Sequence, residues 1–501
     1  MRIPDLIVFV LYMAGITVYG SFFYKKNKTS DAFTLGNQAI PRWVITMSIF
    51  ATYVSSISFI ALPGNAYQTN WNAFVFSLSI PIAAVIAVLF FVPLYRKVNS
   101  PSAYTLLEQR FGPWARIYVS VCYILTQLMR VGTILYLLAI TVNAVFGWEI
   151  APVIVITGVI VMLYSILGGL QAVVWTDAIQ GIVLIAGALI CALYLLLNMP
   201  EGPGQLFSIA VENNKFSLGS FGSGLSESTF WVVLIYGIFI NLQNFGIDQN
   251  YVQRYMASRS DTDAKRSAFF GGMLYIPVSF IFFFIGTSLY SFYHSGAAQL
   301  PETLLDISKS DRIFPYFIVN ELPAGLTGLL ISSIFAAGMS TISTSFNSSA
   351  TVFLTDYYRR YFNPKAANKD SMKVLYVSSF IISVLGIFIG IAMINVKSAL
   401  DAWWKLASIF SGGMLGIFLL AAFSQVKKSG AAIAGIIAGI VLILYLSAGP
   451  LIFGKNIPGG HLHGYLTIVF GTMAIFLTGF IASWIFQFKA KPPKNLMPPE
   501  H

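Results

Sequence analysis

The sequence predicts an all-α integral membrane protein that crosses the bilayer about thirteen times. Of its 501 residues, 57% are hydrophobic and only 10% are charged, and the mean hydropathy is +0.76. A water-soluble protein of this length needs a charged surface that this composition does not supply. Apolar runs of about 20 residues recur from end to end, and each is long enough to cross roughly 30 Å of hydrocarbon.

The apolar runs fill the chain and leave no room for a soluble domain, so residues 1–501 are expected to form one membrane domain. The longest loops between runs, 198–228 and 292–319, are too short to fold alone. The first run lacks a small-residue cleavage site and is interpreted as a retained span, not a signal peptide. The expected spans are 4–23, 43–68, 72–95, 115–145, 151–168, 172–197, 229–253, 268–291, 320–356, 373–394, 399–421, 430–449 and 463–487.

Lysine and arginine are divided unevenly between alternate loops, and this division predicts the orientation. Twenty-two of the 30 lie in one set of loops and only six in the other. The N-terminus is therefore expected outside and the C-terminus in the cytoplasm of a plasma membrane protein, as an odd number of spans requires. The net charge of +11 is dispersed over these loops, so contact with anionic lipid explains it better than nucleic acid.

Of the ionisable residues within the expected spans, three are the most informative, because a charge there is costly unless it faces a partner or a cavity. Arg130 either forms a buried pair with Asp177 or backbone carbonyls, or clamps an anionic substrate; we favour the clamp, because guanidinium matches carboxylate through two parallel hydrogen bonds. Asp177 fits an ion pair, a cation ligand or a proton carrier. Asp248 has Arg254 within two turns, which favours a helix-end pair or an inner gate contact.

The run AAGMSTISTSFNSSA, residues 336–350, carries eight Ser, Thr or Asn residues in a span that is otherwise apolar. On a helix, four of them form one narrow stripe and three more lie about a quarter turn away. Bonding to the helix's own carbonyls or close helix packing explains a single hydroxyl, but not a stripe in register. Hydroxyl and carbonyl oxygens suit hard cations such as Na⁺. The first stripe is Ser340, Ser343, Thr344 and Asn347, and the second is Thr341, Ser345 and Ser348.

Two spans are expected to be interrupted, which membrane helices tolerate where they line a cavity. The second span has Tyr53, Ser55, Ser56 and Ser58 at its centre, and the seventh has Asn241, Gln243, Asn244 and Gly246. The two lie five spans apart, which suggests two five-helix repeats, a frequent design of secondary transporters. The expected repeats are 43–197 and 229–421, with 4–23 and 430–487 as extra peripheral helices.

Three motifs in order resemble segments of the sodium:solute symporter family. They are GGLQAVVWTDAIQ (168–180), QNYVQRYMASRSDTDAKRSAFFG (249–271) and MSTISTSFNSSATVF (339–353). The resemblance covers nearly the whole chain. It implies a five-plus-five inverted repeat of the LeuT type with extra helices at the ends.

The resemblance also implies the ion sites. The sodium site shared by the family matches Ala51 and Val54, which offer carbonyls, together with Ala337, Ser340 and Thr341. A further sodium site, found in some members, matches Asp177, Ser340, Ser343 and Thr344. The hydroxyl stripe would then serve two neighbouring Na⁺ sites on one helix.

Within the family, the chain looks most like the bacterial sialic acid symporters. This implies that Arg130 holds the substrate carboxylate and that Ser55 and Ser58 are its hydroxyl partners, with Ser77 as a further contact that reaches less far than an amide. Two Na⁺ would enter with each sialate by alternating access. No cofactor and no obligate protein partner are expected. The remaining polar residues expected near the substrate are Tyr53, Ser56, Gln243 and Asn244.

Other functions remain as alternatives at this point. The solute could be proline, a sugar or a monocarboxylate, or coupling could run through a proton on Asp177. A receptor is disfavoured because no regulatory domain is appended. An enzyme is disfavoured because the sequence contains no GxSxG, HExxH or GxxxxGK motif.

Overall fold

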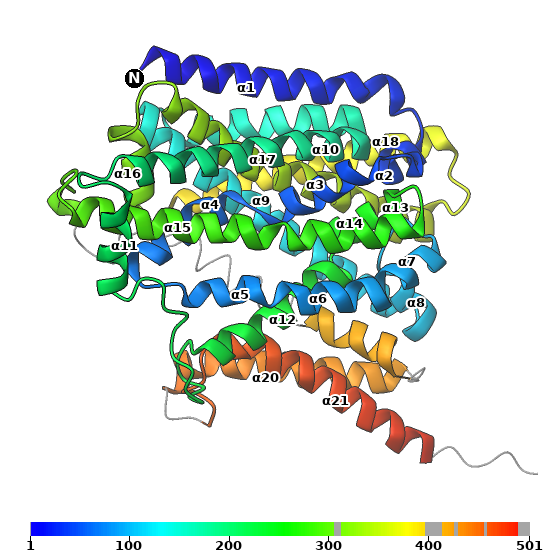
Figure 1. Cartoon of the computed structure of the whole chain (residues 1–501). Helices are drawn as coiled ribbons and strands as arrows, with labels where there is room; N and C mark the ends of the chain where they lie inside the picture. The colour runs from blue at the N-terminus through cyan, green and yellow to red at the C-terminus, as the bar shows by residue number, and fades with distance from the viewer. Residues whose placement is uncertain (1, 305–311, 396–412, 425–428, 455–457, 489–501) are drawn as a thin grey trace, which may run out of the picture.

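The structure is a computed structural model, and it describes residues 2–304, 312–395, 413–424, 429–454 and 458–488. Within them, ten helices are long and apolar enough to cross a membrane, and a bent pair of helices adds one more. The long helices lie roughly along one direction, with the N-terminus at one end of the bundle and the end of the last helix at the other (Figure 1).

The first half of the chain contains the first expected repeat and the helix before it. Its helices are α1 (Ile3–Ser21), α2 (Ser30–Leu35), α3 (Arg42–Tyr53), α4 (Ser56–Gln68), α5 (Val75–Leu78), α6 (Ile80–Ile86), α7 (Val92–Val98), α8 (Thr105–Phe111), α9 (Pro113–Phe146) and α10 (Ile150–Leu197), with shorter turns η1 (Phe22–Lys26), η2 (Gly36–Gln38), η3 (Asn72–Phe74) and η4 (Ala87–Phe91).

The second half contains the second expected repeat and the last two spans. Its helices are α11 (Pro203–Glu212), α12 (Phe230–Ile247), α13 (Gln249–Ala257), α14 (Asp261–Met273), α15 (Tyr275–His294), α16 (Ile313–Asn320), α17 (Leu326–Val352), α18 (Asn368–Ala392), α20 (Ser429–Phe453) and α21 (Leu466–Phe488), with η5 (Glu302–Leu304), η7 (Phe353–Phe362) and η8 (Met393–Asn395). Of the expected span 399–421, only Gly413–Phe423 is described as a helix; the rest lies outside the described residues.

Helix α10 contains two of the expected spans. Its 48 residues would reach about 72 Å if straight, well over twice the hydrocarbon thickness. The backbone turns at Gly169, where φ is +57° and ψ is −155°, a conformation that glycine adopts without a Cβ penalty. The Leu167 carbonyl beside this turn accepts a hydrogen bond from Asn27 Nδ2 (3.0 Å), on the side predicted to be cytoplasmic.

Helix α17, which carries the hydroxyl stripes, is the central helix of the bundle. In its most apolar window, 89% of the residues are buried, and the helix packs against α1, α3, α4, α9, α10 and α18. α17 and α10 approach each other closely: if Gly187 of α10 carried a Cβ atom, that atom would lie 2.1 Å from Oγ of Ser333 on α17. The stripes therefore face protein on all sides, as a site in the bundle interior requires.

The two predicted interruptions are present, and one lies elsewhere than expected. α3 and α4 meet at Val54 and Ser55 with a bend of 54°. α12 stays helical through Asn241 and Gly246, and the break comes at Asp248, which is extended (φ −72°, ψ 125°). The expectation for the seventh span was therefore wrong in position. Amides can point sideways from an intact helix, whereas an aspartate is a frequent N-cap of the helix that follows.

Candidate functional site

The break between α3 and α4 is built by its own residues. Val54 ends α3 with its amide bonded to the Phe50 carbonyl (3.1 Å), and Ser55 begins α4 as an N-cap, its hydroxyl accepting from Ser58 N (3.4 Å). Carbonyls in the last turn of a helix lack an intrahelical donor. The Ala51 carbonyl is one of these, and it turns toward α17.

The residues expected to form the shared sodium site come together at this break. Ser340 Oγ lies 3.0 Å from the Ala51 carbonyl oxygen and 3.0 Å from that of Ala337. Thr341 Oγ1 lies 3.2 Å from the Ala337 carbonyl, and all four residues are buried. Val54 is also fully buried and lies three residues beyond Ala51. Two hydroxyls and two carbonyls thus converge from a broken helix and an intact one.

A second polar cluster surrounds Asp177, and it contains an arginine. Asp177 Oδ2 accepts hydrogen bonds from Ser48 Oγ (2.7 Å), Arg254 (2.6 Å) and Thr344 Oγ1 (3.5 Å). Arg254 also donates to Ser48 Oγ (2.7 Å) and Thr344 Oγ1 (2.6 Å). Both Asp177 and Arg254 are fully buried. Ser343 precedes Thr344 on α17, and its hydroxyl donates to the Ser340 carbonyl (3.1 Å).

The expected pair of Asp248 with Arg254 is therefore wrong, and the alternative pair of Arg130 with Asp177 does not form either. Asp177 pairs with Arg254, not with Arg130, and Asp248 does not pair with Arg254. Arg130 instead approaches Asp248, with 4.0 Å between Nη1 and Oδ2. The spacing in the sequence suggested that Arg254 lies near Asp248. In the structure, the Arg254 side chain points from α13 toward Ser48 on α3 and Asp177 on α10.

Buried atoms without hydrogen-bond partners mark the Asp177 cluster as incomplete. In the part of the chain that the structure describes, Asp177 Oδ1 has no hydrogen-bond partner, and neither does either amide atom of Gln180, one helical turn further on. Eighteen buried side-chain atoms of the described residues are unpaired, but Asp177 Oδ1 is the carboxylate oxygen among them, and leaving such an oxygen without a partner is costly. Arg254, Ser48 and Gln180 were absent from the expected set of site residues.

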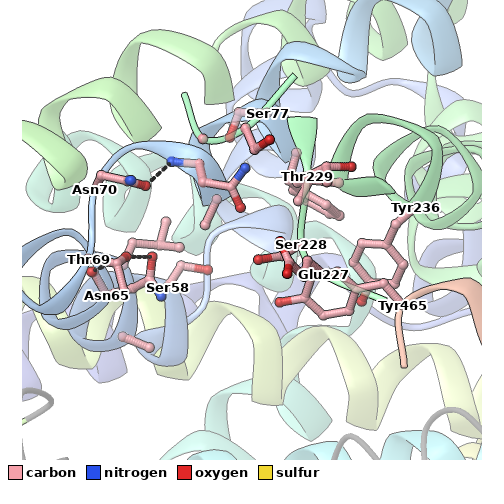
Figure 2. Close-up of a pocket in the computed structure, with 18 of the residues that line it drawn as sticks. Ser58, Asn65, Thr69, Asn70, Ser77, Glu227, Ser228, Thr229, Tyr236 and Tyr465 are labelled. Carbon is pink, nitrogen blue, oxygen red and sulfur yellow. Dashed lines mark hydrogen bonds between the residues drawn. The ribbon is translucent and has the colours of Figure 1, made fainter. Parts of the chain in front are cut away.

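A cavity of about 490 Å³ opens beside the α3–α4 break toward the side predicted to be extracellular. Two of the expected substrate residues, Ser58 and Ser77, line it, and Ser77 Oγ lies 2.8 Å from Ser279 Oγ. Figure 2 shows Asn65 and Thr69 on one flank and Tyr465 on the other. The lining is polar on α4 and aromatic toward α12 and α21, a mixture suited to a ligand with hydroxyl groups and apolar edges.

The outer rim of this cavity is held by a buried lysine. Lys215 Nζ donates to the carbonyls of Tyr67 (2.7 Å) and Thr69 (3.1 Å) at the end of α4, and it lies 3.7 Å from the centre of the Tyr290 ring. Burial lowers the pKa of Lys215 to about 8. A cation at a helix C-terminus stabilises it, so this contact fixes the outer half of the broken helix.

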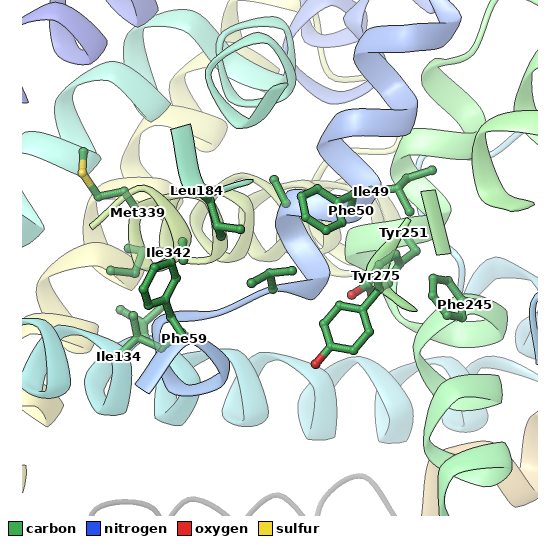
Figure 3. Packing of buried hydrophobic residues seen from close by; sticks show 14 of the residues in the cluster. Ile49, Phe50, Phe59, Ile134, Leu184, Phe245, Tyr251, Tyr275, Met339 and Ile342 are labelled. Carbon is green, nitrogen blue, oxygen red and sulfur yellow. The ribbon is translucent and has the colours of Figure 1, made fainter. Parts of the chain in front are cut away.

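An aromatic layer lies between the cavity and α13. Tyr275 lines the cavity and contacts Tyr53, with ring centres 4.5 Å apart. Tyr53 stacks on Phe245 at 5.3 Å and contacts Tyr251 at 6.3 Å. Figure 3 shows Tyr275, Tyr251 and Phe245 on one side of the broken helix and Phe59 on the other. This layer closes the cavity toward the cytoplasmic side.

The other residues expected to contact the substrate differ in burial and in their hydrogen-bond partners. Tyr53 bonds through its hydroxyl to Asn241, which sequence analysis treated only as a helix interruption. Asn244 lies near the same hydroxyl. Ser56 and Gln243 are buried, and each has an oxygen without a partner.

Arg130 does not line the cavity. It lies on α9 with its side chain 21% exposed, facing Asp248 at the second helix break. In this structure the expected clamp is therefore turned toward an internal carboxylate, on the far side of the aromatic layer from the cavity.

The chain is similar to known membrane transporters over most of its length. A model described as the sodium:solute symporter family matches residues 33–439. The chain belongs to this family. Its members are transporters rather than enzymes, so the chain is a multi-pass membrane symporter.

Individual relatives are similar over nearly the full length. The symporter is 31% identical to the sodium/sialic acid symporter SiaT of Proteus mirabilis (strain HI4320) over 492 residues, which is 97% of this chain and 95% of that protein. It is 27% identical to the human sodium-coupled monocarboxylate transporter 1, over 90% of this chain and 74% of that protein. A solved substrate-bound, outward-open Na⁺-coupled sialic acid symporter superposes with a TM-score of 0.89 at 29% identity, covering 96% of this chain and 98% of that one. This confirms the predicted LeuT-type helical fold of the symporter.

Proposed function

We propose that this symporter imports sialic acid together with Na⁺, with two ions for each sialate and no organic cofactor. The observation that carries the proposal is the junction of α3 and α4, where the Ala51 carbonyl and the hydroxyls of Ser340 and Thr341 converge next to a cavity lined by Ser58 and Ser77. The similarity to sialic acid symporters supplies the substrate.

The proposed coupling of Na⁺ to substrate follows from the few residues that separate the ion ligands from the substrate ligands in the sequence. Ala51 and Val54 would bind the shared Na⁺ through their carbonyls, and Ser55 and Ser58 lie one to four residues beyond Val54. In the structure the Ser340 hydroxyl donates to the Ala51 carbonyl; Na⁺ would replace this bond and hold the end of α3. Fixing the break positions Ser55 and Ser58 for substrate, and each ligand must then raise the affinity for the other.

We further propose that a second Na⁺ binds at Asp177, Ser340, Ser343 and Thr344, with Gln180 beside it. Asp177 Oδ2 is occupied by Arg254, but Oδ1 is buried and bare, which leaves a carboxylate oxygen for an ion. Asp177 and Arg254 together are neutral, so an added Na⁺ leaves an excess positive charge in a dry site. The carboxylate of an arriving sialate would compensate it, which couples the second ion to an anionic substrate.

Uptake by purified protein in liposomes tests the function. We expect labelled sialic acid to accumulate when Na⁺ is outside and not when choline replaces it at constant pH. Two Na⁺ with one sialate carry one net charge, and about 2.3 kcal/mol is gained per 100 mV of inside-negative potential, so a potential should accelerate uptake. Transport that persists in choline would indicate proton coupling through Asp177 and contradict the proposal.

A small monocarboxylate is the second candidate substrate, because of the similarity to a monocarboxylate transporter. A cavity of about 490 Å³ lies within the range of roughly 300–1,000 Å³ for ligand pockets and is generous for a three-carbon acid. In a competition panel, unlabelled sialic acid should therefore inhibit uptake at lower concentrations than lactate or pyruvate. The reverse order would favour the monocarboxylate.

Ser340→Ala is expected to raise the Na⁺ concentration for half-maximal uptake about ten-fold. The change removes one oxygen ligand that the two proposed ion sites share, and a hydrogen-bonding group to a charge contributes about 1.5–3 kcal/mol. Ser332→Ala is the matched control, because Ser332 is buried on the same helix and bonds only its own Gly328 carbonyl (2.8 Å). Equal Na⁺ dependence in both variants would show that the Ser340 hydroxyl serves packing.

Asp248→Asn is expected to lower the KM for sialic acid about five-fold. The Asp248 carboxylate lies 4.0 Å from Arg130 and so competes with substrate for the guanidinium, and a contact at this distance is worth about 1 kcal/mol even at the dielectric constant of water. Asparagine keeps the N-cap of α13. Asp261→Asn, which breaks the surface pair with Arg96 (2.7 Å), should leave KM unchanged. A higher KM in Asp248→Asn would mean that the carboxylate positions Arg130 for substrate.

A further inference from the structure

A second hollow, separate from the transport path, lies at the end of the bundle that is predicted to face the cytoplasm. It has a volume of about 870 Å³ and lies between the segment that follows α1 and the first turns of α18. Four lysines line it, and all four are exposed: Lys25, Lys28, Lys369 and Lys373. With Asp370, the one carboxylate in its lining, they leave a net charge of +3.

The two walls of this hollow are held together by hydrogen bonds. Asn368 Nδ2 donates to the Lys28 carbonyl (3.1 Å), and Asn368 Oδ1 accepts from Ser30 N (2.8 Å). Arg359 donates to the hydroxyls of Ser30 (3.0 Å) and Ser371 (3.1 Å) behind them. The lysines are therefore presented by an ordered frame.

Among the residues that the structure describes, the lysines have no acidic partner that would neutralise them. In the described part of the chain, none of the four forms an ion pair within 4.0 Å. Four ammonium groups around one hollow repel one another, so an anion that enters the hollow relieves that repulsion.

Both walls change from basic to apolar along their helices. On α18, Lys369 and Lys373 are followed at helical spacing by Val377 and then Ile381, whose side chains are 48% and 49% exposed. Residues four apart lie on one face of a helix, so charge and hydrocarbon surface form one continuous stripe. On the opposite wall, Phe22 at the end of α1 is 72% exposed and lies three residues before Lys25.

From this arrangement we propose that the hollow binds an anionic phospholipid of the cytoplasmic leaflet. The phosphate would lie among the four lysines, and the acyl chains would follow Val377 and Ile381 into the membrane. The apolar half of the stripe favours a lipid over a soluble phosphate, which would use only the lysines. Basic pockets between membrane helices on the cytoplasmic side bind such headgroups. The proposal does not depend on which solute is transported.

The test measures lipid retention and thermal stability of the full-length protein in detergent. Phosphatidylglycerol is added to the purified protein, and native mass spectrometry counts bound lipids while the unfolding temperature is recorded; phosphatidylcholine and inorganic phosphate serve as comparison ligands. We expect phosphatidylglycerol alone to be retained and to raise the unfolding temperature. Stabilisation by phosphate equal to that by phosphatidylglycerol, or equal retention of phosphatidylcholine, would overturn the proposal.

Two double variants locate the effect. Lys369→Gln with Lys373→Gln should weaken phosphatidylglycerol binding about 25-fold, since one lysine near a membrane surface contributes about five-fold. Lys265→Gln with Arg266→Gln removes the same charge from exposed positions on α14 and should change binding less than two-fold. Both variants should keep Na⁺-dependent uptake in liposomes, which verifies folding. If the two variants lost binding equally, the overall charge of the protein would explain lipid binding, and the proposed site would be contradicted.

Discussion

Arg130→Lys is expected to reduce sialic acid uptake at least 100-fold. Lysine keeps the positive charge but cannot offer the planar pair of N–H donors that matches a carboxylate. Removing one partner of a desolvated charge pair costs about 2–5 kcal/mol or more. The measurement is the initial rate of labelled uptake against substrate concentration, with protein content matched in the liposomes.

The same series separates the clamp from a structural role. Arg130→Ala should lose transport completely, yet Na⁺ should still raise its unfolding temperature, because the oxygen cluster at Ala51 and Ser340 is intact. Arg360→Ala, at a surface position that is 43% exposed and pairs with Glu108, should transport as the parent protein does. If Arg130→Lys showed a normal KM and a normal uptake rate, positive charge alone would suffice, and the proposal of a bidentate clamp would be contradicted.

The second large effect is expected at Asp177. Asp177→Asn leaves the fully buried Arg254 without a counter-charge, which should destabilise the protein by about 3–5 kcal/mol. In the protein that still folds, the Hill coefficient for Na⁺ in sialic acid uptake should fall from about 2 to about 1, because the proposed second ion site loses its only charged ligand.

A double variant distinguishes the loss of stability from the loss of an ion. Asp177→Asn combined with Arg254→Gln removes both charges, so no unpaired charge remains buried, and most of the unfolding temperature should return. The Hill coefficient should stay near 1. A double variant with restored stability and a Hill coefficient of 2 would place the second Na⁺ elsewhere.

Hydropathy and residue spacing predicted much of this molecule. Long apolar runs can only be membrane helices, and the stripe of Ser340, Ser343 and Thr344 could only be tolerated facing protein, as its burial confirms. The break in the second span was also predictable, because Tyr53, Ser55 and Ser58 place polar groups at the centre of an apolar run. These inferences depend on local sequence, which is why they succeeded.

The network around Asp177 could not be derived in the same way. Arg254 lies in a stretch of polar residues that resembles a cytoplasmic loop. The low hydropathy of this stretch gives no sign that every residue of α13 is buried. Its partners Ser48 and Asp177 are more than 70 residues away in the sequence. The packing of α13 against α3 and α17, together with that of α10 against the same two helices, brings them together.

Weaker signals for the missed residues were nevertheless present. Asp248 follows an apolar run and precedes QNYVQRY, the pattern of an N-cap, and it marks the true break of the seventh span. Gln180 lies three residues after Asp177 in the same motif, a spacing that places the two on one face of a helix. The orientation of Arg130 toward Asp248, by contrast, is a tertiary feature that no local pattern encodes.

The central claim is that Na⁺ and substrate share one set of positions around the α3–α4 break and so bind cooperatively. Calorimetric titration of the purified symporter with sialic acid, once in Na⁺ and once in choline at equal ionic strength, tests it most directly. The account predicts that Na⁺ lowers the Kd for sialic acid at least ten-fold, and that sialic acid lowers the Kd for Na⁺ by a matching factor. Equal sialic acid affinity in the two solutions would contradict it.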